Sequence, residues 1–465
     1  MRYKDYLAAE YIKVEDILHF KDERVLKQKE LICEFKTTLI TFSLNIVGPY
    51  KVFDLTVKTF YEGLIKIKEE LEIEKFKILK EVIEKRKAGY QAYLVVDGNE
   101  IEIKKILLQI EERFPLGRLF DIDVLDKNGK KVSRSYYSMP YRKCLLCDRD
   151  AYECSRGRTH SVEELVEKEI EIMSEYFENK YSNILSNLTL KALLFEVNTT
   201  PKPGLVDLCN NGSHTDLDVY LFQNSAISLE PFFKEFVLFG INNGGLKLDS
   251  LFNNLRKLGK NAEYRMFKVT NNINTHKGAI FIFAITLAAL GWMYSNKIRY
   301  SRKKLVETIS NLSKDCLLDF ENITLNNELS HGQEIYKKYN VRGIRGEAIT
   351  GFDIIVNDII NYFEEQLECC YFNDSGVKTL LKIISKIDDT NIISRSDFNS
   401  LEYYKKLIKK SFDNNDNLID LAKELDVEFM EKRISAGGSA DLLALVYFIY
   451  FLETDQSLNL FRINS

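Results

Sequence analysis

The feature that most constrains the fold of this chain is a change in hydrophobic pattern near residue 160. Before this point, runs of β-branched residues alternate with amphipathic segments, and after it the pattern is helical. All six prolines lie at or before Pro231, so none interrupts the helical patterns that follow. We therefore predict a multidomain α+β protein, with an N-terminal α/β domain over residues 1–174 and a larger all-α domain over residues 175–465.

These patterns predict the individual elements. In the N-terminal domain we expect helical character over residues 1–36, 60–87 and 101–113, and strands over residues 38–46, 91–96, 118–125 and 131–137. A turn at Lys127-Asn128-Gly129 joins the last two strands. In the all-α domain we expect helices over residues 162–185, 188–197, 226–239, 246–257, 278–294, 303–316, 351–370, 376–387, 401–409, 417–430 and 440–452.

Composition and charge exclude some classes of partner. The net charge of −4 predicts no general affinity for nucleic acid or anionic membranes. The longest apolar run, residues 279–294, is shorter than the roughly 20 residues of a membrane span, so we expect a buried core helix there. The N-terminus lacks the apolar region of a signal peptide, and we therefore predict a cytoplasmic protein.

Two aspartates give the sharpest signal in the N-terminal domain, within the run Gly117-Arg118-Leu119-Phe120-Asp121-Ile122-Asp123. Side chains alternate faces along a strand, so Asp121 and Asp123 should point the same way, about 6–7 Å apart. Mg²⁺ carrying phosphate oxygens would neutralise this pair, and Arg118 suits a phosphate. The expected chemistry is nucleotidyltransferase-like, with pyrophosphate as leaving group. An edge strand with an exposed polar face is the alternative interpretation.

A cysteine cluster follows this strand. The spacing Cys144-x2-Cys147-x6-Cys154-x5-His160 supplies the ligand types of a Cys3His zinc site, although its second half lacks the usual paired spacing. The alternative is a basic loop in which the cysteines pack and Arg142, Arg156 and His160 bind phosphate. Both interpretations remain open from the sequence alone.

The all-α domain contains a polar stretch that no packed helix requires, Pro201-Lys202-Pro203-Gly204-Leu205-Val206-Asp207 followed by residues 210–218. Proline fixes its backbone and glycine permits close approach, so the polar side chains are free to contact a ligand. We expect His214, Asp216 and Asp218 to be catalytic candidates. Lys202, Asp207 and Asn210 are expected to bind substrate.

Four further motifs place glycine or small polar residues at helix boundaries: Asn274-Thr275-His276-Lys277-Gly278, Arg342-Gly343-Ile344-Arg345-Gly346-Glu347, Asp388-Asp389-Thr390-Asn391 with Arg395, and Ser435-Ala436-Gly437-Gly438-Ser439-Ala440-Asp441. Free backbone N–H groups at helix N-termini suit phosphate. We expect substrate contacts from His276, Lys277, Arg342, Arg345, Glu347, Arg395, Gly437, Gly438 and Asp441. Asp216, Asp218, Asp388 and Asp389 are candidate Mg²⁺ ligands. Taken singly, each motif is explained as a capped helix end, and together they fit a kinase, a nucleotide hydrolase or a glycosyl transferase.

These motifs also carry a resemblance. Residues 190–445 resemble triphosphoribosyl-dephospho-CoA synthase through P-K-P-G-L-V-D, N-G-S-H-T-D-L-D, N-T-H-K-G-A-I-F, G-I-R-G-E-A, D-D-T-N and G-G-S-A-D-L-L-A. The N-terminal domain resembles apo-citrate lyase phosphoribosyl-dephospho-CoA transferase through F-S-L-N-I-V-G-P, G-R-L-F-D-I-D-V and R-K-C-L-L-C with Cys154, Arg156 and His160. Fused in this order, they resemble the bifunctional family that makes and attaches the citrate lyase prosthetic group. Ala436 departs from the proline expected before Gly437.

The resemblance implies two reactions. The all-α domain would join ATP to 3′-dephospho-CoA, with adenine displaced by the ribose 2′-hydroxyl while Mg²⁺ holds the triphosphate. The N-terminal domain would transfer phosphoribosyl-dephospho-CoA to a serine of the citrate lyase acyl carrier protein (γ subunit) and release pyrophosphate, a step that suits Asp121 and Asp123. Two alternatives stay open: the same chemistry for a malonate decarboxylase carrier, and a non-catalytic maturation factor.

Overall fold

The computed structural model describes residues 2–137, 142–318 and 331–462, and it divides the chain into two compact units. The first unit ends at Glu178 and the second begins at Asn179. This division falls inside one long helix, α6 (Val162–Asn198). The sequence predicts a break in this helix near Ser186, and that prediction is wrong. Ser186 Oγ donates to the carbonyl oxygen of Glu230 at 2.7 Å and leaves the helix uninterrupted.

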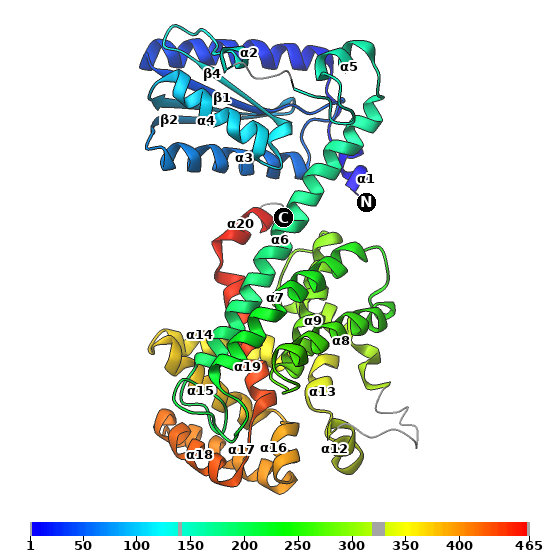
Figure 1. The fold of residues 1–465 in the computed structure, drawn as a ribbon, viewed down its shortest axis with the longest axis vertical. Coiled ribbons are helices and arrows are strands. Elements are labelled where there is room, and N and C mark those ends of the chain that lie inside the picture. The colour runs from blue at the N-terminus through cyan, green and yellow to red at the C-terminus, as the bar shows by residue number, and fades with distance from the viewer. Residues whose placement is uncertain (1, 138–141, 319–330, 463–465) are drawn as a thin grey trace. The chain divides into compact units, whose positions relative to one another are not determined.

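The N-terminal unit contains, within the described residues, an antiparallel sheet of four strands in the order β2-β3-β1-β4 (Figure 1). The strands are β1 (Thr38–Leu44), β2 (Lys77–Arg86), β3 (Gly89–Asp97) and β4 (Phe120–Leu125). In the register between β1 and β4, Ser43 lies opposite Asp121 and Thr41 lies opposite Asp123. The two aspartates therefore share one sheet face with two hydroxyl side chains.

Helices cover both faces of this sheet. Figure 1 shows α2 (Val14–Phe35) along one face and α3 (Asp54–Ile73) along the other, where α4 (Glu100–Arg113) also packs. Among the described residues of this unit, α1 (Arg2–Leu7) and α5 (Ala151–Gly157) are also α-helices. On the α3 face, the rings of Phe42, Phe60 and Phe120 pack together, with Phe42 and Phe120 edge to face at 5.2 Å. The α2 face is apolar at one end and polar at the other, and the polar end carries the aspartate pair.

Two N-terminal predictions are wrong. The helix expected over residues 60–87 ends at Ile73, and its second half is β2. The sequence of this strand is rich in charged residues and lacks the alternation of apolar and polar residues that predicts a strand. The strand lies at the edge of the sheet and is exposed along much of its length. The strand expected over residues 131–137 is absent from the described segment, where only the bridge between Leu125 and Lys131 forms. Side-chain bonds from Arg134 to Glu112 and from Tyr137 to the Ile101 carbonyl draw that segment toward α4.

The described elements of the second unit are helices, in agreement with the sequence. They are α7 (Val219–Asn242), α8 (Phe252–Val269), α9 (Lys277–Ser295), α10 (Arg302–Leu312), α12 (His331–Tyr339), α13 (Gly343–Ile349), α14 (Ile360–Leu367), α15 (Phe372–Lys386), α16 (Thr390–Arg395), α17 (Phe398–Asp413), α18 (Leu418–Lys432), α19 (Gly437–Thr454) and α20 (Asn459–Arg462). A π-helical segment, Ile354–Ile359, precedes α14.

The core of the helical unit is built on α9 and α19, which are apolar around most of their circumference. α9 is long and apolar enough to span a membrane, but it is mostly buried inside the unit as a core helix. It packs very close to α7, and glycine at Gly240 and Gly291 permits this approach. A Cβ at either position would lie 2.1 Å from a carbonyl oxygen of the facing helix. The N-termini of α9 and α19 both carry polar motifs predicted from the sequence.

Candidate active sites

The loop between α6 and α7 carries the polar stretch that the sequence singles out, and one buried carboxylate holds its shape. One oxygen of Asp207 accepts hydrogen bonds from the Lys202 backbone N–H and from Thr200 Oγ1, both at 2.9 Å. The other accepts from the backbone N–H groups of Cys209 and Asn210 at 2.7 and 3.0 Å. Because these four donors occupy both oxygens, Asp207 supports the loop backbone in this structure.

A second carboxylate, Asp426 of α18, ties the loop to the rest of the unit. It accepts from the Gly204 N–H at 2.9 Å and from Asn210 Nδ2 at 2.8 Å. Gly204 has a φ of 65°, and a Cβ there would lie 2.3 Å from the Ile434 carbonyl oxygen. Glycine is therefore required at this close approach. Asn210, like Asp207, holds the loop in place.

A cavity of about 310 Å³ lies beside this loop, and the separate polar motifs meet around it. This volume is at the lower end of the roughly 300–1,000 Å³ of small-molecule sites. Ten predicted site residues line it: Lys202, His214, His276, Lys277, Asp388, Asp389, Arg395, Gly437, Gly438 and Asp441. Glu196 of α6 also lines the cavity and was not among the predicted site residues. The helical unit thus brings residues from five separate sequence segments to one place.

A cluster of acidic groups around one lysine forms part of the cavity wall. The buried Lys202 Nζ donates to the Glu196 carboxylate and, at 2.9 Å, to its backbone carbonyl. Burial raises the pKa of Glu196, and the charge of Lys202 opposes that shift. Burial also raises the pKa of Asp441 well above its ordinary value, with further contributions from Glu196 and Asp389. Asp441 is therefore displaced toward its protonated form, as a proton donor requires.

Glycine makes room for this carboxyl group. A Cβ at Gly278 would lie 1.9 Å from Asp441 Oδ2, so a larger residue in the N-T-H-K-G motif would displace Asp441. This contact explains why glycine follows Lys277 at the start of α9.

His276, next to Lys277, presents one unsatisfied nitrogen. Its Nδ1 lies 3.0 Å from Ser225 Oγ, and its Nε2 is buried without a hydrogen-bond partner among the described residues. Burial, followed by the charge of Lys202, lowers the pKa of His276 to about 3. His276 is therefore a neutral imidazole with one nitrogen available to a bound molecule, because buried polar atoms are normally paired.

The N-terminus of α19 forms another part of the wall. Asp389 accepts from the backbone N–H and the hydroxyl of Ser439 at 2.7 and 2.8 Å, and from the Asn391 N–H at 2.9 Å. It thereby joins α16 to α19 and leaves Gly437 and Gly438 at the cavity, where the helix dipole favours a negative group.

His214 and Arg395 lie together where the loop meets α16 and the start of α19. His214 Nε2 is 3.2 Å from Ser435 Oγ, and Nδ1 is 3.3 Å from Arg395 Nη2. Burial, followed by the charge of Arg395, lowers the pKa of His214, while Asp216 opposes the shift. His214 is therefore favoured in its neutral form, and Asp216 acts on its pKa through charge without lining the cavity.

The remaining helical candidates lie outside the cavity lining. Asp218 caps α7 by accepting from the Leu221 N–H at 2.7 Å. Arg342 occupies the N-cap position of α13, and Arg345 donates to the Cys316 carbonyl at 2.9 Å. Burial raises the pKa of Glu347, with a contribution from the charge of Asp388. From this motif, Ile344 lines the cavity instead.

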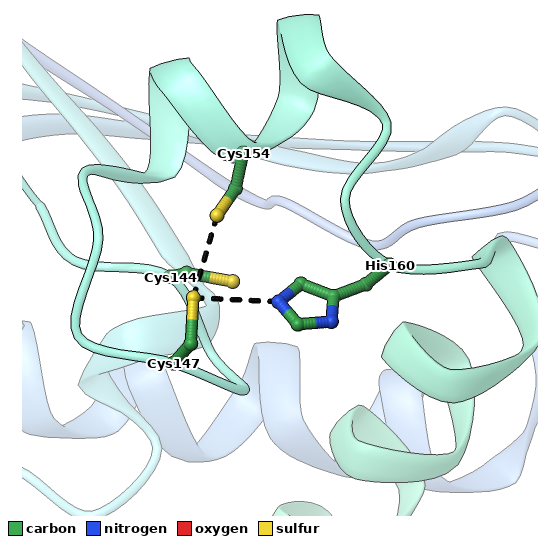
Figure 2. Close-up of side chains that lie close together, drawn as sticks. All are labelled: Cys144, Cys147, Cys154 and His160. Atoms are coloured by element: carbon green, nitrogen blue, oxygen red, sulfur yellow. Dashed lines mark hydrogen bonds between the residues drawn. The ribbon is translucent and has the colours of Figure 1, made fainter.

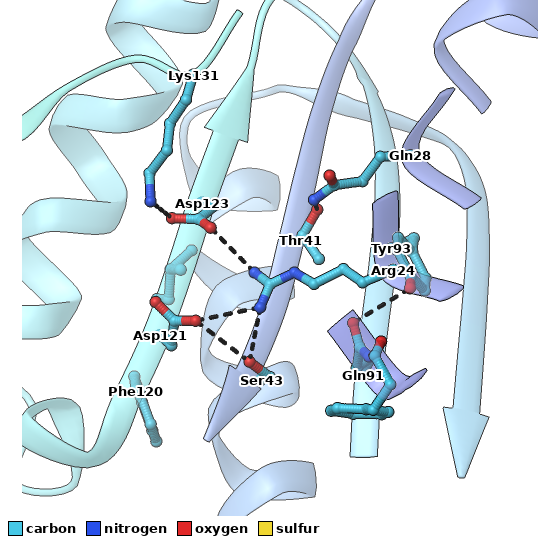
Figure 3. Close-up of polar contacts among 12 residues, drawn as sticks. Arg24, Gln28, Thr41, Ser43, Gln91, Tyr93, Phe120, Asp121, Asp123 and Lys131 are labelled. Atoms are coloured by element: carbon cyan, nitrogen blue, oxygen red, sulfur yellow. Dashed lines mark hydrogen bonds and ion pairs between the residues drawn. The ribbon is translucent and has the colours of Figure 1, made fainter. Parts of the chain in front are cut away.

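In the N-terminal unit, Asp121 and Asp123 point to the same side of β4, as expected from strand alternation (Figure 3). A cation lies between them, the guanidinium of Arg24 from α2. Arg24 Nη1 lies 3.2 Å from Asp121 Oδ2, and Nη2 lies 3.0 Å from Asp123 Oδ2. Lys131 Nζ is 2.5 Å from the other oxygen of Asp123. Arg24 and Lys131 thus neutralise the negative charges of the two aspartates.

Arg24 was missed in the sequence because nothing local marks it among the many charges of α2. The Asp pair itself calls for a positive partner, but the partner lies 97 residues away in the chain. Gln28, one helical turn along α2, donates to Thr41 Oγ1 at 3.0 Å and fixes the helix over the same polar face (Figure 3).

The basic candidates near β4 have partners inside the unit. Arg142 donates to the Phe120 carbonyl at 2.9 Å and pairs with Glu111 at 2.7 Å. Arg118 donates to the Lys143 carbonyl, and Arg156 lies 4.8 Å from the ring centre of Tyr152. His160 lies with the three cysteines, where its Nε2 is 3.3 Å from Cys147 Sγ (Figure 2).

The fold and these two clusters define a protein of two units, each with a polar site suited to phosphate-bearing substrates. Comparison with known families supports one assignment for each unit. The family described as apo-citrate lyase phosphoribosyl-dephospho-CoA transferase matches residues 12–176. The family described as ATP:dephospho-CoA triphosphoribosyl transferase matches residues 182–459.

Two relatives are similar to this chain over nearly its whole length. The protein named CitXG of Haemophilus influenzae is 31% identical over 459 residues, covering 95% of this chain and 96% of the relative. CitXG of Leuconostoc mesenteroides subsp. cremoris is 31% identical over 469 residues, covering 96% and 98%. The 2-(5''-triphosphoribosyl)-3'-dephosphocoenzyme-A synthase of Haemophilus ducreyi is 34% identical over 331 residues, covering 66% of this chain and 99% of the relative.

The chain therefore belongs to the CitXG family of bifunctional transferases. It makes triphosphoribosyl-dephospho-CoA from ATP and 3′-dephospho-CoA with release of adenine, and it transfers the phosphoribosyl-dephospho-CoA group to apo-citrate lyase with release of pyrophosphate.

Proposed function

We propose that the two reactions occur at separate sites: the cavity of the helical unit makes the triphosphoribosyl intermediate, and the aspartate pair on β4 supports its transfer. The observation that carries this proposal is the convergence of distant motifs on one cavity, far along the chain from Asp121 and Asp123. We place the transferase domain, of nucleotidyltransferase-like type, at residues 1–174 and the synthase domain at residues 175–465.

In the cavity, the triphosphate of ATP lies against the N-terminus of α19, at Gly437 and Gly438. A long buried helix favours negative charge at this end, and Lys277 and Arg395 line the same cavity. Among the carboxylates of the helical unit predicted to bind Mg²⁺, Asp388 fits best. It lines the cavity and, among the described residues, has only Oδ1 paired, with Lys405 at 2.6 Å, whereas both oxygens of Asp389 accept hydrogen bonds within the protein and Asp218 caps α7. Mg²⁺ supplies charge neutralisation of the triphosphate when it is bound.

Proton transfers in the cavity follow from the displaced pKa values. His214, favoured as neutral, accepts the proton of the 2′-hydroxyl of 3′-dephospho-CoA at Nδ1, once Arg395 no longer donates to that nitrogen, as the 2′-oxygen bonds to C1 of the ATP ribose. Asp441, displaced toward its protonated form, gives a proton to the adenine that leaves C1. His276 Nε2 supplies a hydrogen-bonding group for one of the two substrates.

At the N-terminal site, Asp121 and Asp123 would hold Mg²⁺, which neutralises the departing pyrophosphate when it is bound. Arg24 occupies one oxygen of each aspartate in the protein alone, and Lys131 occupies another oxygen of Asp123. Both oxygens of Asp123 are therefore paired, so Asp123 would hold the ion in place of one contact with Arg24 or Lys131, and the guanidinium of Arg24 would suit a phosphate group beside it.

The acceptor is a serine of the citrate lyase acyl carrier protein, in line with the family of residues 12–176. We expect the reaction in the cytoplasm, without nucleic acid or membrane partners. The competing acceptor is a malonate decarboxylase carrier. A reaction with ATP, 3′-dephospho-CoA and either carrier separates them, with adenine, pyrophosphate and carrier mass measured together. Labelling of the malonate decarboxylase carrier alone would overturn our assignment.

A further inference from the structure

A cluster of ligand-type side chains lies outside both proposed active sites. The sulfur atoms of Cys144, Cys147 and Cys154 and a ring nitrogen of His160 all lie within 4.8 Å of one another (Figure 2). Cys147 Sγ lies 3.4 Å from Cys154 Sγ and 3.3 Å from His160 Nε2. Three thiols and one imidazole point toward a common centre from three neighbouring pieces of chain.

This spacing fits a tetrahedral zinc ion. Zn–S bonds of about 2.3 Å and Zn–N bonds of about 2.0 Å place tetrahedral ligand atoms about 3.5–3.8 Å apart. The separations of 3.4 and 3.3 Å are slightly below these values, and every other pair lies within 4.8 Å, so small adjustments of the side chains would bring all four ligand atoms to the ion. A disulfide requires a sulfur–sulfur distance of about 2.05 Å, and Cys147 and Cys154 are free thiols in the structure.

The backbone is also arranged for a metal-binding turn. The Leu146 N–H points to Cys144 Sγ at 3.5 Å, an interaction that favours a thiolate. The Cys144 N–H donates to the Arg149 carbonyl and the Ala151 N–H to the Arg142 carbonyl, both at 2.8 Å, which closes the loop around the cluster. Only Cys154 of the cluster is buried, so the loop has little apolar core of its own. Small segments of this kind commonly depend on a cross-link or a metal.

We propose that Cys144, Cys147, Cys154 and His160 bind a structural zinc ion that fixes residues 142–160, which precede α6. All four ligands come from the protein, so no position is left for a substrate, as is typical of structural zinc. The fixed segment contacts the start of β4: Arg142 donates to the Phe120 carbonyl at 2.9 Å, and Arg118 donates to the Lys143 carbonyl. Zinc would therefore hold the loop that flanks Asp121, a consequence that rests on the proposed function.

The first test is metal content of the full-length protein, purified without chelator and supplied with ZnCl₂. We expect about one zinc per chain by elemental analysis, and tetrahedral thiolate absorption when Co²⁺ replaces it. Cys144→Ser and Cys147→Ser should lose most of this zinc, whereas Cys33→Ser, which changes an exposed cysteine of α2, should retain it. Wild-type protein without zinc and without the cobalt spectrum would overturn the proposal, as would full zinc in Cys147→Ser.

The second test separates zinc binding from the proposed reactions. In Cys147→Ser, carrier labelling should fall about tenfold or more, since loss of a structural metal disorders its surroundings. Adenine release from ATP and 3′-dephospho-CoA should be unchanged, because the cavity lies in the other unit. Unchanged labelling in a zinc-free variant would overturn the link between the ion and β4. The zinc measurement does not depend on activity, so it stands even if the assignment of the N-terminal site fails.

Discussion

The two proposed sites of this protein are built in opposite ways. The cavity of the helical unit gathers residues from five segments and buries several of them, so the pKa values of Glu196, Asp389 and Asp441 are raised and these groups are displaced toward protonation. The site on β4 rests on strand alternation, which places two aspartates side by side, and basic side chains neutralise both. At the first site, burial raises the pKa of carboxyl groups such as Glu196 and Asp441. At the second site, the negative aspartates form ion pairs with basic side chains.

This difference matches the chemistry that each unit performs. Displacement of adenine needs a proton donor for a weak leaving group, and a desolvated carboxyl group can supply it. Transfer to a serine with release of pyrophosphate needs neutralisation of negative charge, and paired carboxylates that hold a cation can supply it. The comparison therefore predicts that each reaction depends on a different kind of residue.

The largest expected effect is at the aspartate pair. Asp121→Asn should reduce carrier labelling by about a thousandfold, because the transferred group loses its charge stabilisation. Adenine release should persist, since the cavity is untouched. The matched control is Asp22→Asn, which changes an exposed carboxylate of α2. Loss of both activities in a folded Asp121→Asn protein would break the separation of the sites.

Asp441→Asn should reduce adenine release by about a hundredfold, the typical contribution of a general acid. In the wild type, adenine release should fall as the pH rises through the raised pKa of Asp441, because only the protonated form donates. The variant should lose this dependence while still labelling the carrier from preformed intermediate. Asp420→Asn, an exposed change on α18, serves as control. An unaltered pH profile in Asp441→Asn would contradict the acid role.

Arg24→Met tests the charge pairing on β4. Removing the guanidinium leaves the two aspartates free of their shared partner, so half-saturation by Mg²⁺ should need about tenfold less metal, equivalent to about 1.4 kcal/mol. Maximal labelling should also fall, because the guanidinium is lost from the phosphates. The measurement is the Mg²⁺ dependence of labelling, and an unchanged dependence would show that Arg24 does not compete with the metal.

The smallest expected effect concerns Asp218, a catalytic candidate in the sequence whose side chain caps α7 in the structure. Asp218→Ala should lower the free energy of unfolding by about 1 kcal/mol, and Asp218→Asn should preserve it, because asparagine is an equally good N-cap. Thermal unfolding of both variants measures this. Loss of adenine release in the stable Asp218→Asn protein would instead show that Asp218 takes part in the reaction.

Much of the fold follows from local patterns. The periodicity of the second half predicts helices because each one buries a stripe or a whole surface, as α9 and α19 do. The shared face of Asp121 and Asp123 follows from the two-residue period of a strand. The edge strand β2 escaped prediction because its charges fit an exposed helix equally well.

The parts of the sites that escaped prediction depend on contacts between distant residues. Arg24 reaches the aspartates only because α2 lies over the sheet, and Glu196 reaches Lys202 only because α6 passes the loop that follows it. Local motifs also do not distinguish a ligand contact from a loop support. Asp207 bonds within its own loop and Asn210 bonds to Asp426 of α18, while His276 keeps a buried nitrogen without a partner among the described residues.

The most direct test of separate sites is a complementation assay with Asp121→Asn and Asp441→Asn. Each protein is incubated with ATP, 3′-dephospho-CoA and acyl carrier protein, alone and mixed, while adenine, pyrophosphate and carrier mass are measured. Our account predicts adenine without carrier labelling for the first variant, little of either for the second, and labelling restored in the mixture. If folded Asp121→Asn releases no adenine, or if preformed intermediate does not restore labelling in folded Asp441→Asn, the two reactions share one site.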